Sequence, residues 1–172
     1  MPWAISDSST LIHLAVLGRL SLLREYYEQV LVPPAVWREV VEEGQGRAGA
    51  REVEEAAQSG WLKVLTPTNE ALLRLLKRDL EDGEAEAIAL AVERQGEVIL
   101  LDDSDARRVA AVYGLSKTGV IGILIQARLE GKLTSLRQEL DRLRQDAGFW
   151  ITEALYRQAL EAVGESVISG HE

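Results

Sequence analysis

The chain has 172 residues, of which 47% are hydrophobic and 27% charged, ordinary values for one globular domain with a sizeable core. It contains no cysteine, which excludes disulfides, thiolate metal sites and a cysteine nucleophile. The net charge of −9 argues against a general nucleic-acid coat, because phosphate binding usually needs a basic surface. It leaves room for a metal-dependent nuclease, since a bound divalent cation inverts the field of its carboxylates.

The first half of the chain alternates short apolar runs with helical patterns. Residues 3–6 predict a strand that stops at Asp7, and Ser8, Ser9 and Thr10 offer caps for a helix that Gly18 ends. The pattern then predicts a helical stretch over 20–26, a strand over 30–32, a helix over 35–43 after two prolines, a helix over 50–59 and a strand over 61–65.

The second half is richer in helix. We expect helices from Asn69 to about Leu80, over 84–95 and over 105–113, with an apolar strand over 98–101 before the last of these. Three more helices are expected, over 119–130, 133–146 and 152–163. Short apolar strands that alternate with helices indicate an α/β fold with a mainly parallel sheet covered on both faces.

Two of the predicted strands end in acidic residues. Asp7 follows the first, and Asp102, Asp103 and Asp105 follow the strand over 98–101. Parallel strands bring these ends to one edge of the sheet, where open α/β sheets bind ligands. Carboxylates gathered there repel unless a cation neutralises them, and oxygen ligands suit Mg²⁺ or Mn²⁺. The structural alternative is that each aspartate merely caps the next helix, and the pattern does not decide between the two.

Two glutamates need separate arguments. Glu84 begins an alanine-rich helix that is apolar on nearly every side, so a carboxylate there needs a partner or a metal, with Glu86 expected as the exposed one of the two. The alternative for Glu84 is a first-turn acid that complements the helix dipole. Glu39 projects away from the apolar stripe of its helix, and periodicity alone assigns it to solvent.

Other chemistries have little raw material. There is no phosphate-binding Gly-x-x-x-x-Gly-Lys loop, no Gly-x-Gly-x-x-Gly and no Gly-x-Ser-x-Gly elbow. The only histidines are His13, in an apolar helix, and His171 near the last residue, so a histidine triad or zinc site is not expected. No run approaches the roughly 18 apolar residues of a membrane span, and no signal peptide pattern begins the chain, which leads us to expect a cytoplasmic protein.

Taken in order, the acidic positions resemble those of the PIN-domain superfamily, over about residues 3–130, and most closely an uncharacterised prokaryotic branch of predicted nucleic-acid-binding proteins. The motifs that carry the resemblance are Ile-Ser-Asp7-Ser-Ser9-Thr-Leu-Ile, Val-Pro-Pro-Ala-Val-Trp-Arg-Glu39-Val-Val, Gly-Glu84-Ala-Glu-Ala-Ile-Ala-Leu-Ala and Leu-Leu-Asp102-Asp103-Ser-Asp105. Each motif is weak alone, whereas their order and spacing together are fairly specific.

The resemblance implies an α/β/α sandwich and a metal-dependent nuclease, with Mg²⁺ or Mn²⁺ as cofactor and single-stranded RNA as substrate. It implies catalytic roles for Asp7, Glu39, Glu84 and Asp103, and metal binding by Asp7, Glu84, Asp103 and Asp105. Glu84 stands where the family usually has Asp, so coordination through water is plausible. Ser9 and Asp102 would support the site, although the family varies at the position of Asp102.

Further expectations are broader. Arg107, Arg108 and Lys117 are candidate phosphate contacts, with helix-surface charge as the alternative. The resemblance also implies an antitoxin partner and a homodimer, as in prokaryotic toxin ribonucleases. We expect one domain over 1–165, with a core over about 3–130, a helical extension over about 131–165 and a disordered tail over 166–172.

Two alternatives stay open. The first is a non-catalytic PIN-like module that binds nucleic acid or a partner protein, favoured by the acidic net charge and the unusual Glu84. The second is a phosphoacceptor domain with Lys117 as its lysine, which is disfavoured because the third predicted strand, over 61–65, has no aspartate.

Overall fold

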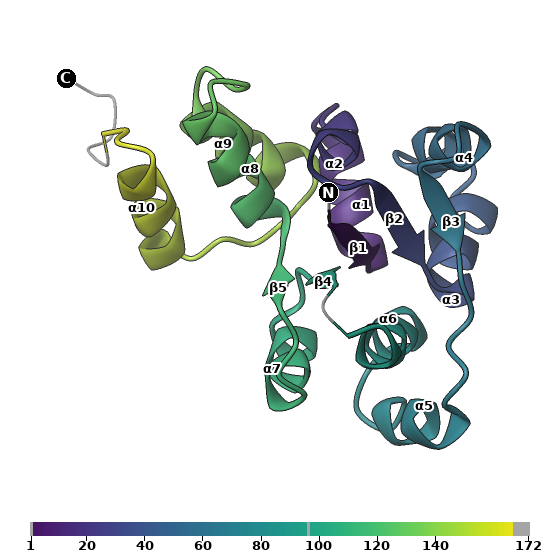
Figure 1. Cartoon of the computed structure of the whole chain (residues 1–172). Coiled ribbons are helices and arrows are strands. Elements are labelled where there is room, and N and C mark those ends of the chain that lie inside the picture. Colours follow the sequence, from purple (N-terminus) through teal and green to yellow (C-terminus); the bar gives the residue numbers. More distant parts are fainter. Residues whose placement is uncertain (1, 96, 167–172) are drawn as a thin grey trace.

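A five-stranded parallel sheet forms the centre of the computed structural model, which describes residues 2–95 and 97–166 (Figure 1). The strands pair in the order β3-β2-β1-β4-β5. Their bounds are β1 Trp3–Ser6, β2 Gln29–Val32, β3 Leu62–Val64, β4 Val98–Leu100 and β5 Lys117–Thr118. The α/β class and the parallel sheet are thus as predicted, and the first strand along the chain lies in the middle of the sheet.

Helices cover both faces of this sheet (Figure 1). One face carries α1 Ser8–Val16, α2 Ser21–Tyr26, α4 Ala50–Gln58, α8 Val120–Leu129, α9 Leu136–Asp146 and α10 Glu153–Ala162. The other carries α5 Glu70–Leu76, α6 Asp82–Glu93 and α7 Ser104–Val112. The helix α3 Pro34–Trp37 continues into a wider π-helical segment, η1 Arg38–Glu42.

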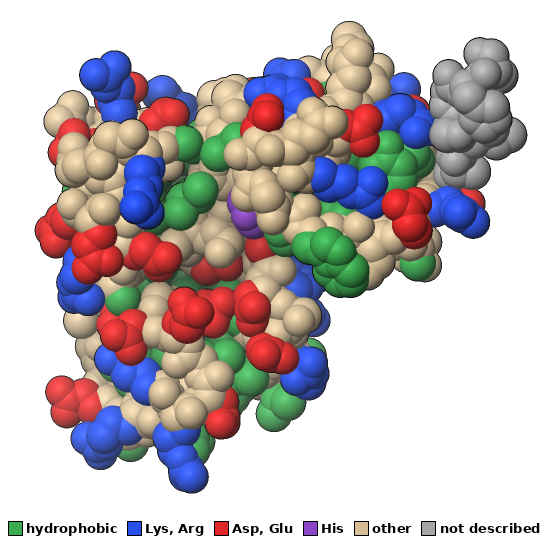
Figure 2. All heavy atoms as spheres, turned by 180° about the vertical axis from the view of Figure 1, so that it is seen from behind, with side chains coloured by type: hydrophobic (Ala, Val, Ile, Leu, Met, Phe, Trp, Pro, Cys, Tyr) green, Lys and Arg blue, Asp and Glu red, His purple; other side chains and the backbone are tan. Residues whose placement is uncertain are grey.

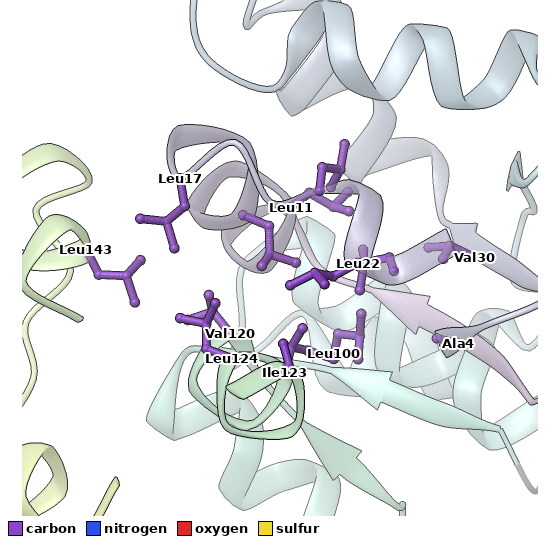
Figure 3. Packing of buried hydrophobic residues seen from close by; sticks show 14 of the residues in the cluster. Ala4, Leu11, Leu17, Leu22, Val30, Leu100, Val120, Ile123, Leu124 and Leu143 are labelled. Carbon is purple, nitrogen blue, oxygen red and sulfur yellow. The ribbon is translucent and has the colours of Figure 1, made fainter. Parts of the chain in front are cut away.

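The two apolar cores follow from strand alternation. Successive side chains of a strand point to opposite faces, so Ala4 and Leu100 join the core under α1 and α8, whereas Ile5 and Ile99 join the core under α6. Figure 3 shows the first core, where Leu143 of α9 lies opposite the side chains of α1. The two helices beyond residue 131 therefore share the core of the sheet.

Several element boundaries differ from the prediction. The helix expected to reach Leu80 ends at Leu76, with turns after it. The two-residue strand β5 was not predicted, because Lys117 and Thr118 are too few and too polar to form an apolar run. The helix predicted over 35–43 is interrupted by the π turn, in which the Glu43 N–H donates to the Arg38 carbonyl at 2.7 Å.

Two further expectations concern membrane-spanning segments and the C-terminal residues. In the described residues, no helix combines the length and apolar character needed to cross a membrane. Of the tail predicted over 166–172, only Ser166 belongs to the described residues, and His171 lies outside them.

Candidate active site

Asp7 ties the carboxyl ends of β1 and β4 together. Its backbone N–H donates to the Leu100 carbonyl at 3.0 Å. Its carboxylate accepts from the Thr10 N–H at 2.9 Å and the Asp102 N–H at 3.1 Å, and its side chain is 1% exposed. Asp7, rather than Ser8 to Thr10, therefore caps α1. Each carboxylate oxygen still has a second lone-pair site, so capping and cation binding are compatible.

The buried charge of Asp7 is poorly compensated by other side chains. Burial raises the pKa of Asp7 to about 7, and the charge of Asp102 adds to this effect, while the hydrogen bonds from Thr10 and Asp102 oppose it. A carboxyl group with this pKa binds its proton near neutral pH and would release it to a cation placed against it.

Glu84 is half-buried in the first turn of α6 and responds to the same surroundings. Burial is the main reason that its pKa is raised to about 7, and the negative charges of Asp103, Glu81 and Asp7 raise it further. Glu84 is thus close enough to Asp7 and Asp103 to be repelled by both. The edge of the sheet predicted from sequence thus places Asp7 and Asp103 within electrostatic range of Glu84.

A small cavity of about 30 Å³ lies beside Asp7. Its lining consists of Asp7, Ser8, Ser9, Glu39, Glu81, Gly83 and Glu84. The volume suffices for about one or two waters or a small ion. The Ser8 hydroxyl is buried there without a hydrogen-bond partner among the described residues. Because a hydroxyl both donates and accepts, it can contact a water or an ion bound in this cavity.

Glu39 belongs to this cavity although most of its surface is exposed. It lies on η1, and its Oε1 would be 3.8 Å from a Cβ added at Gly83 in α6. A helical periodicity of 3.6 assigned Glu39 to solvent, and the resemblance assigned it to the site. The structure shows that an exposed side chain can also line the cavity.

Asp102 faces the other way, toward α8. One carboxylate oxygen accepts from the Val120 N–H at 2.8 Å, and the other lies 2.7 Å from Nδ1 of His13. A Cβ at Gly119 would lie 2.5 Å from the first oxygen, so glycine permits this close approach. The His13 ring in turn packs on Phe149, with ring centroids 4.6 Å apart. Asp102 therefore holds β4, α1 and α8 together.

Asp103 caps α7 by accepting from the Ala106 N–H at 2.9 Å, and it is exposed. It lines a second, larger cleft of about 710 Å³, which also contains Arg107 and Lys117. The Arg107 guanidinium donates to the Leu101 carbonyl at 2.8 Å. Asp105 and Arg108 line neither hollow and form an exposed ion pair at 3.1 Å. Figure 2, which shows the molecule from behind the view of Figure 1, has acidic side chains gathered across its middle.

The sequence profile of a family described as a PIN domain matches residues 3–165. The chain belongs to the PIN-domain family. Among solved structures, a PilT N-terminus domain protein from the hyperthermophilic archaeon Sulfolobus solfataricus is similar, with 17% sequence identity and a TM-score of 0.49. The similar region covers 73% of this chain and 92% of that chain. No curated protein matches the sequence.

Membership in the family confirms the resemblance and gives this PIN domain a nuclease-like fold. PIN domains are generally nucleases, bind nucleic acid and typically use divalent metals.

The donor chemistry of this PIN domain fits a hard divalent cation, because the lining is all oxygen and two carboxyl pKa values are raised. Across residues 2–95 and 97–166, however, no three Asp, Glu or His side chains converge closely enough to hold one ion together. The residues therefore fit an ion that keeps several of its waters, as Mg²⁺ usually does, rather than one fully enclosed by protein ligands.

Two acidic residues differ from the sequence interpretation. Glu86 was expected to be exposed, which is wrong: it is 9% exposed, accepts from the Ala35 N–H at 3.0 Å and lies 3.8 Å from the Lys77 ammonium. The Ala35 N–H at the start of α3 has no partner within its own helix, and its bond to Glu86 compensates the burial of that carboxylate. Glu81, which lines the small cavity, was not singled out because it lies in a turn before Asp82 and Gly83, where acids are common.

Proposed function

We propose that this PIN domain is a metal-dependent endoribonuclease that hydrolyses phosphodiester bonds of single-stranded RNA with Mg²⁺ or Mn²⁺. The observation that carries the proposal is the position of Glu84, which is half-buried and repelled by Asp103, Glu81 and Asp7, so that its pKa is raised to about 7. A bound cation would favour the charged form of this carboxyl by offsetting both the cost of its burial and the repulsion.

The proposed roles follow the positions of the side chains. Asp7, Glu84 and Asp103 would hold the ion, partly through water, and Glu39 would complete the catalytic set from the opposite wall of the small cavity. When bound, the ion supplies an activated water and stabilises negative charge on the phosphate. Asp105 would act as an outer metal ligand once it leaves its ion pair with Arg108. Ser9 and Asp102 would support the site.

The test is cleavage of a mixed pool of single-stranded RNA by the purified protein with Mg²⁺ or Mn²⁺. We expect cleavage that EDTA stops and that Asp7→Asn reduces by at least about 100-fold, the order expected when a catalytic interaction of 3–4 kcal/mol is lost. Asp105→Asn is a milder test of the outer position. An intact RNA pool with both metals would sink the proposal.

The second candidate is a non-catalytic PIN-like module that binds nucleic acid or a partner protein. It is favoured by the absence, within the described residues, of three converging ligands. Isothermal titration with Mn²⁺ separates the two candidates. Uptake of an ion that Asp103→Asn weakens supports the nuclease, whereas no uptake together with RNA binding unaffected by Asp103→Asn supports the module.

We also propose, from the resemblance to toxin ribonucleases, that the protein acts in the cytoplasm as a homodimer with an antitoxin partner. Light scattering of the purified chain tests the dimer. Co-expression with a small neighbouring reading frame tests the partner, because a cognate antitoxin would relieve growth inhibition caused by the wild-type chain and co-purify with it.

A further inference from the structure

Trp150 is 80% exposed, whereas the other three tryptophans, Trp3, Trp37 and Trp61, are half-buried. Such exposure of a large apolar ring is unfavourable, because burying a side chain of this size stabilises a protein by roughly 1.5–3 kcal/mol. Single exposed apolar residues are common on protein surfaces, so the neighbouring structure decides whether this ring has a role.

The segment around Trp150 is anchored on both sides. On one side, the Phe149 ring packs on His13 and its N–H donates to the Leu143 carbonyl at 3.0 Å. On the other, the Ile151 side chain is 3% exposed, and its carbonyl accepts from the Arg144 guanidinium at 2.9 Å. The backbone therefore presents the Trp150 ring from a fixed position instead of leaving it on a free loop.

Trp150 lines the 710 Å³ cleft that starts at Asp103. The walls come from the beginning of α7, from β5 and the first turn of α8, and from the connection between α9 and α10. The volume lies within the 300–1,000 Å³ of ligand sites, which gives room for a base with its sugar and phosphate.

Charge in this cleft differs from that of the whole chain. The net charge is −9, whereas the cleft lining contains two cations, Arg107 and Lys117, and two acids, Asp102 and Asp103. Both acids already accept from backbone N–H groups at helix starts, Asp102 from Val120 and Asp103 from Ala106. Lys117 forms no ion pair within the part of the chain that the structure describes, so its charge is available to a ligand. An aromatic face beside two cations matches a nucleotide, with its base on the ring and its phosphate on the cations. An apolar partner segment would leave Lys117 without compensation.

We propose that this cleft binds one nucleotide of a single-stranded nucleic acid, with its base stacked on Trp150 and its phosphate on Lys117 and Arg107. The site rests on the proposed function for the class of its ligand. It adds a base platform formed by the connection between α9 and α10, next to the carboxylates. Only an unpaired base can reach such a ring, so the platform would select single strands over duplexes.

The experiment measures binding of a fluorescein-labelled oligouridylate by anisotropy in EDTA, where the proposed cleavage does not occur. We expect Trp150→Ala to weaken binding by about 5- to 150-fold, because base stacking on an aromatic ring contributes roughly 1–3 kcal/mol. Trp150→Phe keeps a ring and should retain most of the affinity. Val112→Ala is the control, since Val112 is also 80% exposed but does not line the cleft.

A second pair of variants tests the phosphate contact. Lys117→Gln should reduce the slope of log affinity against log salt by about 0.7, the value for one contact to a single strand. Lys63→Gln removes the same charge from β3, at the opposite edge of the sheet and outside the cleft, and should leave the slope unchanged. The wild-type protein should bind a duplex of the same length more weakly than the single strand. Trp150→Ala should bind the duplex and the single strand about equally.

The outcomes separate this site from the nuclease. RNA binding that depends on Trp150 without cleavage in Mg²⁺ would support the platform and overturn the proposed function. Cleavage with binding indifferent to Trp150→Ala would overturn the platform alone. Wild-type protein that does not bind the oligouridylate, or Trp150→Ala that changes only the oligomeric state in light scattering, would also overturn it, and the latter would assign the ring to a contact between copies.

Discussion

At the residue scale, Asp7 and Glu84 give the stability of the protein an unusual pH dependence. Burial raises the pKa of Asp7 from 3.8, and of Glu84 from 4.5, to about 7 in the folded protein. Folding therefore favours the protonated forms, and their contribution to stability is present below about pH 4 and lost as pH rises to about 7.

We predict that, without metal, Asp7→Asn stabilises the protein increasingly as pH rises from about 4 to about 7. Its amide cannot ionise, so the variant avoids a burial penalty that is on the order of 4 kcal/mol for this nearly inaccessible group. Urea unfolding of both proteins in EDTA across this range measures the difference. A difference independent of pH would show that the carboxyl of Asp7 titrates normally.

The neighbouring glutamates of α6 should respond oppositely to removal of their carboxylates. Glu84→Gln removes a repelled charge and should stabilise the metal-free protein at pH 8. Glu86→Ala should destabilise it by about 1–3 kcal/mol, because the Ala35 N–H loses its acceptor in a buried place. Glu86→Gln keeps an acceptor oxygen and serves as the control. Chemical denaturation gives all three values, and equal effects at the two positions would contradict this assignment.

At the element scale, the first turn of α8 approaches Asp102 closely because Gly119 has no side chain. A Cβ there would meet the Asp102 carboxylate at 2.5 Å and the Leu101 carbonyl at 2.8 Å, so β4 or α8 must shift. We predict that Gly119→Ala destabilises the protein by about 1–3 kcal/mol, the usual range for overpacking, and lowers RNA cleavage by displacing Asp102, whose N–H donates to Asp7.

Gly122→Ala is the matched control for this prediction, in the same helix. Its Cβ would meet only the side chain of Thr118, which can rotate away, and alanine favours a helix interior by about 1 kcal/mol over glycine. Thermal unfolding compares the two variants. If Gly122→Ala destabilised the protein as much as Gly119→Ala, the contact with Asp102 would not be the cause.

The elements show which parts of the fold the sequence encodes locally. Apolar runs such as that over 98–101 were sufficient to predict a parallel sheet, and strand ends were sufficient to place Asp7 and Asp103 on one edge. Two contacts between distant segments were not predictable: β5 depends on pairing with β4 rather than on its own composition, and Glu86 depends on the free N–H groups of α3. A regular periodicity of about 3.6 residues also predicts which side chains of 35–43 face the core. The π-helical turn at η1 rotates the later side chains away from those predicted directions.

At the scale of the whole molecule, a bound divalent cation should stabilise the protein more at high pH than at low pH. At pH 8 the carboxylates of the site are charged and the ion relieves their repulsion, whereas at pH 5 protons compete for Asp7 and Glu84. We predict that Mg²⁺ at about 100 times its Kd raises Tm by about 5–10 °C at pH 8, as the linkage relation gives for a protein of this size.

Differential scanning fluorimetry at the two pH values measures this effect, with the same ionic strength of NaCl as the control for general screening of the net charge of −9. Asp103→Asn should reduce the Mg²⁺ effect at pH 8. A shift of equal size at pH 5 and pH 8, or one that NaCl reproduces, would mean that the ion does not bind at these carboxylates.

The central place of β1 also fixes when the site can form. The first strand along the chain pairs with β4, and the bond from the Asp102 N–H to Asp7 spans 95 positions in sequence. A nascent chain that has not yet released β4 from the ribosome lacks Asp102 and Asp103, however well its early helices have formed. Because contacts of such long sequence separation close late, we expect slow folding and a polypeptide without nuclease activity during most of its own synthesis.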